Sequence, residues 1–211
     1  ATSAGGGIHN ASGGDVTVMR STISTNTANG TGAGIYNNGA SFDLNAVTVA
    51  LNNALSDGGG IQSDTNTSLK NTLVALNTAT SGTDVNGSFV SNDYNLIGTD
   101  DANAFPEQPN DIEETDPMVG PLQNNGGLTE THELLEGSLA YNAGDPADLF
   151  NDQIEQAVFG GIRDIGAFEA QTILLSVEDI TEGGSGIVIY PNPSRGFATA
   201  KIPATFGNNL Q

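Results

Sequence analysis

The 211-residue sequence contains no cysteine and no tryptophan, and its five lysine and arginine residues face 25 aspartate and glutamate residues. Without cysteine, the chain has no disulfide, no thiolate metal site and no cysteine nucleophile. The formal net charge of −20 disfavours binding to nucleic acid or to anionic lipid, because few cations are present to neutralise phosphates. No run of about 18 apolar residues occurs, so the sequence predicts no membrane insertion.

A short motif recurs three times in the first eighty residues. Glycine, isoleucine, a variable residue and a polar residue occupy 7–10, 34–37 and 60–63. Three further columns repeat with spacings of 25 or 26 residues: Val18, Leu44 and Leu69; Ile23, Val49 and Val74; Asn26, Asn52 and Asn77. Because the spacing shortens by one residue in all four columns, we interpret this region as a structural repeat.

The composition of the repeat favours strands. Glycine, asparagine, threonine and serine dominate, and no long stretch shows the apolar period of 3.6 residues that a helix needs. A unit this short cannot bury its own apolar face, but stacked units can, with each strand paired to its equivalent in the next unit. The sequence therefore predicts an all-β parallel β-helix over residues 1–99. Its fourth coil would place Val85 opposite Ile61 and end at Ile97.

The asparagine column suggests a ladder. Asn26, Asn52 and Asn77 are expected at a turn, where each side-chain amide can hydrogen bond to the next coil. The glycine column fits corners that need either a positive φ or a close approach of two backbones. A coil at the start of the chain would expose strand edges, so we expect further coils upstream of Ala1.

Strand alternation yields a second candidate site. In each Gly-Ile strand the isoleucine points inward, so His9, Tyr36 and Gln62 form an outward column. Aromatic and amide side chains on a ribbed face are typical of sugar-binding surfaces. They are equally typical of ordinary solvent-facing strands, and both interpretations stay open.

The middle of the chain carries most of the charge. A stretch from Asp100 to Asp116 predicts a loop rather than a buried strand. Acid-rich extracellular loops bind Ca²⁺ through carboxylates and carbonyls, although no stretch follows the twelve-residue EF-hand pattern. The alternative is a solvated acidic surface. The candidate ligands are Asp111, Glu113, Glu114 and Asp116, followed by Asp145, Asp148 and Asp152.

No catalytic residue is predicted. Polysaccharide lyases need a base beside clustered acids, but Arg20 and Lys70 share no column with such a cluster. The carboxylates in the coils show no pair at a repeat spacing, which a glycosidase would require. His132-Glu133 begins a zinc-peptidase pattern, but Glu136 occupies the position of the second histidine.

Residues 71–169 resemble the choice-of-anchor Q domain family of bacterial surface proteins. The matching motifs are NTLVA (71–75) followed by Asn77, DYNLIG (93–98), TDPMVGPL (115–122), NGGLTETH (125–132), LLEGSLA (134–140), NAG (142–144) and DIGAFE (164–169). The resemblance implies a right-handed parallel β-helix that ends in a cap, here residues 100–170. It transfers no catalytic residue. The chain departs from the family pattern at Tyr141-Asn142 and at residues 152–155.

The C-terminal residues are similar to another family. A linker over 171–186 precedes the strand-like Ile187–Tyr190 and the turn Pro191-Asn192-Pro193-Ser194-Arg195-Gly196. This pattern resembles the start of the type A sorting domain of the type IX secretion system of Bacteroidota. The resemblance implies a small β-sandwich, of which 187–211 would be a part, and the type IX machinery as partner.

The two resemblances imply an extracellular protein at the outer-membrane surface of a Gram-negative bacterium. We expect a structural, adhesin-like β-helix exported through its sorting signal, with glycans or other surface proteins as further partners. The alternative is a carbohydrate-active enzyme, a lyase or a glycosidase, with its catalytic coils upstream of Ala1.

Overall fold

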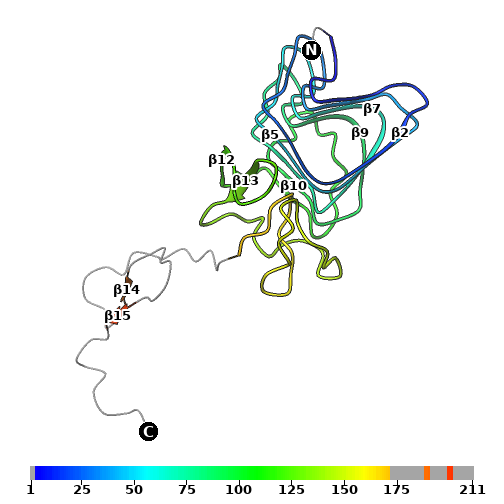
Figure 1. The fold of residues 1–211 in the computed structure, drawn as a ribbon. Helices are drawn as coiled ribbons and strands as arrows, with labels where there is room; N and C mark the ends of the chain where they lie inside the picture. Colours follow the sequence, from blue (N-terminus) through cyan, green and yellow to red (C-terminus); the bar gives the residue numbers. More distant parts are fainter. Residues whose placement is uncertain (1–2, 172–187, 191–198, 202–211) are drawn as a thin grey trace. The chain divides into compact units, whose positions relative to one another are not determined.

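The computed structural model describes residues 3–171 and two short strands at 188–190 and 199–201. The chain divides into two compact units, Ala1–Leu174 and Leu175–Gln211 (Figure 1). Every regular element in the described residues is a β-strand, as the sequence predicts. Among these residues no helix is present that could cross a membrane. In the second unit, β14 (Val188–Tyr190) pairs antiparallel with β15 (Thr199–Lys201).

The first unit is a parallel β-solenoid of about four turns. Equivalent strands of successive coils pair in parallel, and Figure 1 shows the coils stacked on one another. Coil 1 contains β1 (Ile8–Asn10), β2 (Asp15–Ser24) and β3 (Thr27–Ala28); coil 2 contains β4 (Ile35–Asn37), β5 (Ser41–Ala50) and β6 (Asn53–Ala54); coil 3 contains β7 (Ile61–Lys70) and β8 (Leu73–Ala75); coil 4 contains β9 (Val85–Ser91) and β10 (Leu96–Ile97).

The repeat columns of the sequence are the registers of the solenoid. Ile8 lies opposite Ile35, Ile35 opposite Ile61 and Ile61 opposite Val85, which confirms the predicted alignment of the fourth coil. The column that starts at Ile23 also pairs as predicted, through the strands β2, β5 and β8.

These columns fill the centre of the solenoid. Ile35, Ile61 and Val85 are fully buried, and Phe42 packs in the same cluster. Burying one such side chain stabilises the fold by about 1.5–3 kcal/mol. A single coil is too short to bury its own apolar side chains. Stacking solves this, because the coils above and below cover the apolar side chains of each coil. Ile8, in coil 1, is only half-buried.

Two corners of each of the first three coils use left-handed backbone at residues other than glycine. Thr25, Leu51 and Leu76 have φ between 57° and 61°, and each directly precedes an asparagine of the predicted ladder. The second corner repeats the same conformation at Arg20, Ala46 and Asn71. Side chains in this conformation are uncommon and cost about 1–2 kcal/mol each, so the stacked coils must hold them in place.

The acidic stretch after coil 4 is more ordered than its composition suggests. Phe105 is 7% exposed, and its ring centroid lies 6.2 Å from that of Phe89 in β9. The strand β11 (Ile112–Glu113) then pairs in parallel with β10. The sequence interpretation as a plain loop misses both features, because a single aromatic residue among acidic and proline residues gives no periodic signal.

The covering segment, residues 117–170, lies against the side of the solenoid. It begins with the antiparallel pair β12 (Val119–Gln123) and β13 (Thr131–Leu134), and the rest has no regular secondary structure. Leu134, Ala140 and Ile165 form a second apolar cluster with Leu73 and Leu96 of the coils. This cluster joins the segment to coils 3 and 4, and further polar contacts reach Ser24 of coil 1 and Thr48 of coil 2.

Candidate functional site

The asparagine column forms a continuous ladder. The backbone N and Nδ2 of Asn26 donate to Oδ1 of Asn52 at 2.9 and 3.0 Å. The same two groups of Asn52 donate to Oδ1 of Asn77 at 2.9 Å each. Asn52 Nδ2 also donates to the backbone carbonyls of Ile23 and Ala50. The ladder therefore ties successive coils together through side-chain and backbone groups at once.

A carboxylate ends this ladder. The backbone N and Nδ2 of Asn77 both donate to Oδ1 of Asp84, at 2.9 and 2.8 Å, and the backbone N of Thr99 donates to its Oδ2. Burial raises the pKa of Asp84 to about 6, and its hydrogen bonds oppose that rise. An aspartate suits the last position because it accepts hydrogen bonds without leaving an amide donor unpaired.

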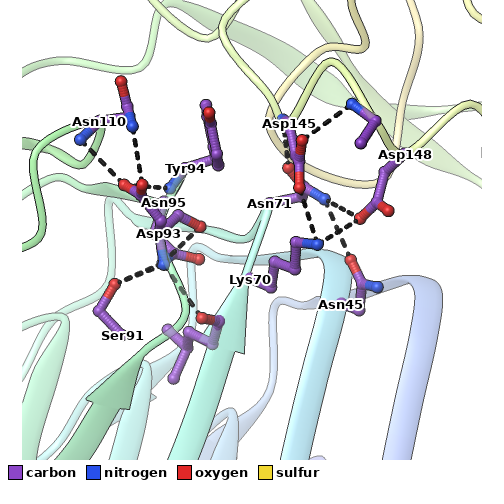
Figure 2. A network of polar contacts seen from close by, with 12 residues as sticks. Asn45, Lys70, Asn71, Ser91, Asp93, Tyr94, Asn95, Asn110, Asp145 and Asp148 are labelled. Atoms are coloured by element: carbon purple, nitrogen blue, oxygen red, sulfur yellow. Dashed lines mark hydrogen bonds and ion pairs between the residues drawn. The ribbon is translucent and has the colours of Figure 1, made fainter.

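A second ladder ends in the same way. The backbone N of Thr72 donates to Oδ1 of Asn95, and the backbone N and Nδ2 of Asn95 donate to Oδ1 of Asp111. Beside this ladder, Asp93 receives two hydrogen bonds from Asn110 (Figure 2). Asp111, a predicted calcium ligand, is therefore bonded within the protein.

The outward column holds the three predicted residues in register. The rings of His9 and Tyr36 lie 4.9 Å apart between centroids, tilted by 39°. The Asp64 carboxylate links Tyr36 to Gln62. It accepts a hydrogen bond from Tyr36 Oη at 2.6 Å and one from Gln62 Nε2 at 2.9 Å. Asn86, the register partner of Gln62 in β9, donates to Gln62 Oε1.

This column is a connected polar network. The hydrogen bond to Asp64 raises the pKa of Tyr36. The exposed ring of His9 and the half-exposed ring of Tyr36 offer apolar faces at one end, and the Asp64 carboxylate offers acceptors at the centre. Sequence periodicity gives the column but misses Asp64, which lies two residues after Gln62 and outside the repeat motif.

The other acids predicted to bind Ca²⁺ also contact protein groups. Lys70 Nζ lies 2.8 Å from Asp145 and 3.0 Å from Asp148, and Asn71 Nδ2 donates to Asp148 (Figure 2). The carboxylate of Asp152 accepts three backbone N–H groups. In the part of the chain that the structure describes, no three acidic or histidine side chains converge as a metal site.

Glu113, in β11, is the predicted calcium ligand with an unpartnered carboxylate oxygen. Burial raises the pKa of Glu113 to about 7, and Glu107, Asp100 and Asp111 add to the rise by repulsion. Its Oε1 is buried without a hydrogen-bond partner. Glu114 and Asp116 line an open pocket of about 300 Å³ beside Asp84, together with Leu76, Asn77, Gly98, Thr99, Thr115 and Pro117.

The basic side chains of the coils hold the covering segment. Lys70 binds Asp145 and Asp148, and Arg20 lies 3.4 Å from the exposed Glu155. His132, which is 1% exposed, joins the Gly120 carbonyl to the hydroxyl of Ser24 in β2. Arg20, Lys70 and His132 are the residues that the lyase and zinc-peptidase interpretations considered, and each of them bridges the coils and the covering segment.

The fold and these ladders define a parallel β-solenoid with a lateral covering segment. Comparison with family models, curated proteins and solved structures finds no match for the chain. Of the sorting motif, Tyr190 ends β14. Pro191, Asn192, Pro193 and Gly196 lie outside the described residues.

Proposed function

We propose that this protein is a secreted structural β-solenoid of the bacterial cell surface, with right-handed coils that act as a stiff spacer and display surface. The observation that carries the proposal is the parallel pairing of equivalent strands through four coils, reinforced by the ladder from Asn26 to Asp84. Such stacking gives a rigid rod-like unit with regularly spaced outward side chains.

Three features support this assignment. The covering segment binds the side of the coils, Phe105 packs on the last coil, and together residues 100–170 would serve as the cap that the choice-of-anchor Q resemblance implies. The acidic surface suits a protein outside the cell, where a high net charge keeps proteins soluble and apart. The Tyr-Pro-Asn-Pro-Ser-Arg-Gly pattern would direct export by the type IX machinery.

Export is tested by locating the protein on intact cells. Antibodies against the solenoid should label the surface of the source bacterium, and inactivation of the type IX translocation pore should abolish that labelling. A second antigen exported by another route serves as the control. Labelling that appears only after permeabilisation of the outer membrane would contradict the proposal.

The adhesive part of the proposal assigns ligand contact to the outward column. Tyr36→Ala should reduce binding to a neutral glycan at least tenfold, because a tyrosine that acts as a hot spot costs about 2 kcal/mol or more when truncated and about 1.4 kcal/mol corresponds to a factor of ten. The measurement is a glycan array followed by titration of the best ligand. Tyr94→Ala is the matched control, since Tyr94 is half-buried on a different part of the coils. Equal losses in both variants would rule out the column as the contact surface.

A further inference from the structure

With Asn86, the outward column has one member in each of the four coils. His9, Tyr36, Gln62 and Asn86 are register partners in successive coils. Neighbouring strands lie about 4.8 Å apart, so the column extends for about 14 Å along the solenoid axis. Two rings occupy coils 1 and 2, and two amides occupy coils 3 and 4. The column therefore matches a short linear ligand that lies along the axis.

A column of glycines supports these side chains. The residue four positions before each member is a glycine with φ between 58° and 67°. These glycines are Gly5, Gly32, Gly58 and Gly82. A Cβ at any of them would lie within 2.8 Å of the Cβ of the column residue. The corner backbone thus packs directly against the base of each column side chain, which reduces the side-chain freedom lost when a ligand binds.

The hydrogen bonds of the column converge on Asp64. Asn86 donates to Gln62, Gln62 donates to Asp64 Oδ1, and Tyr36 donates to Asp64 Oδ2. Each carboxylate oxygen therefore accepts one hydrogen bond from a side chain of the described residues, and each can accept another. Asp64 itself is exposed. The network thus holds two adjacent acceptors at the surface, beside the rings of His9 and Tyr36.

No lysine or arginine in residues 3–171 pairs with Asp64. The three that this range contains all belong to the contacts of the covering segment. Arg20 and Lys70 pair with acids of that segment, and the buried Arg163 lies over an aromatic ring within it. An acidic ligand at the column would bring a second negative charge close to Asp64 without a lysine or arginine to balance it. The surroundings therefore favour a ligand without negative charge.

We propose that the outward column binds a neutral linear glycan along the solenoid axis and that Asp64 determines its specificity. One sugar ring stacks on His9 and Tyr36, and two hydroxyls on adjacent carbons of the next sugar donate to the Asp64 carboxylate. This inference rests on the adhesive function proposed above, and it adds the charge of the ligand, its orientation and the residue that selects it.

The carboxylate favours hydroxyl donors for two reasons. A hydroxyl that donates to a carboxylate makes a charge-assisted hydrogen bond, which is stronger than a bond between neutral groups. A cationic ligand would instead form an exposed ion pair with Asp64, and exposed ion pairs contribute little in water. A neutral sugar chain uses the rings, the amides and the carboxylate together.

Titration of the intact chain with matched glycans tests the charge and the length of the ligand. The probes are a neutral linear oligosaccharide selected on the glycan array, its uronic acid counterpart, its amino sugar counterpart and the corresponding monosaccharide. The wild-type chain should bind the neutral oligosaccharide about tenfold more tightly than the uronic acid form. The monosaccharide should bind more weakly, because it reaches only the rings or only the carboxylate. Equal or tighter binding of the uronic acid or amino sugar form would overturn the inference.

Asp64→Asn tests the specificity residue. The amide keeps the shape of the side chain, but it removes the charge and replaces one acceptor oxygen with a donor. Affinity for the neutral oligosaccharide should fall about tenfold, and the discrimination against the uronic acid form should largely disappear. Asp43→Asn is the matched control, because Asp43 is an exposed aspartate in β5, and it should change neither value.

Tyr36→Ala separates this inference from the proposed function. If Tyr36→Ala loses glycan binding while Asp64→Asn keeps both its affinity and its discrimination, the column is the adhesive surface but the role of Asp64 is wrong. If neither variant changes binding, or if the wild-type chain binds no neutral glycan, the adhesive function and the inference are both wrong.

Discussion

Replacing Asn52 with alanine should lower the free energy of unfolding by about 3 kcal/mol. Asn52 is 1% exposed, and its Oδ1 accepts both donors of Asn26 while its Nδ2 binds Asn77, Ile23 and Ala50. Alanine removes all of these bonds and leaves buried groups of coils 1 and 2 without partners. Each such group costs about 1–3 kcal/mol, partly relieved where water can reach it.

Urea unfolding followed by far-UV circular dichroism measures this loss, provided that the slope of the transition is unchanged. Asn53→Ala is the matched control, because Asn53 is the next residue, is exposed and shares the local sequence. We expect Asn53→Ala to change stability by less than about 0.5 kcal/mol. A similar loss in both variants would mean that strand propensity, rather than the ladder, explains the effect.

The direction of the ladders explains why acids follow them. Asn52 and Asn77 each receive two donors on the side-chain oxygen and direct their own N–H donors to the next acceptor. A ladder of asparagines alone would therefore end with an unpaired donor. Asp84 and Asp111 end the two ladders as acceptors. In Asp84 these hydrogen bonds only partly offset the desolvation, which raises its pKa to about 6.

The sequence is sufficient to predict the coils. The columns through Ile35 and Val49 repeat at the spacing of one turn, and stacking in register follows because each strand must pair with its equivalent. The ladder position of Asn52 follows from the same periodicity. Both the register of the coils and the position of the ladder follow from the repeat spacing and the residue types, so aligning the chain with itself is enough to predict them.

The features outside the repeat could not be predicted in this way. Lys70 forms ion pairs with Asp145 and Asp148, which are more than seventy residues away in the sequence, and no periodic pattern links the three positions. Arg163 and Asp164 look like ordinary surface charges in sequence, yet they are buried. Their positions depend on how an irregular segment folds back onto the coils, and that path is set by backbone hydrogen bonds that composition does not reveal.

The second large effect is expected at the glycine column. Gly34→Ala should lower the free energy of unfolding by about 3 kcal/mol or more, because overpacking against a rigid backbone is costly. A Cβ on Gly34 would lie 2.5 Å from the Gly60 carbonyl oxygen, 2.9 Å from Val49 Cγ1 and 3.0 Å from Asn52 Nδ2. All three belong to packed parts of coil 2 or coil 3, so none can move without disturbing the register.

The matched control distinguishes crowding from backbone strain. Gly13 has a φ of 80°, and a Cβ there would meet nothing within 4 Å. Gly13→Ala should therefore cost only about 1 kcal/mol, the penalty of a left-handed backbone. Urea unfolding of both variants measures the difference. If Gly34→Ala costs no more than Gly13→Ala, the coils can move apart at this corner, and the close approach of neighbouring backbones would not explain the glycine column.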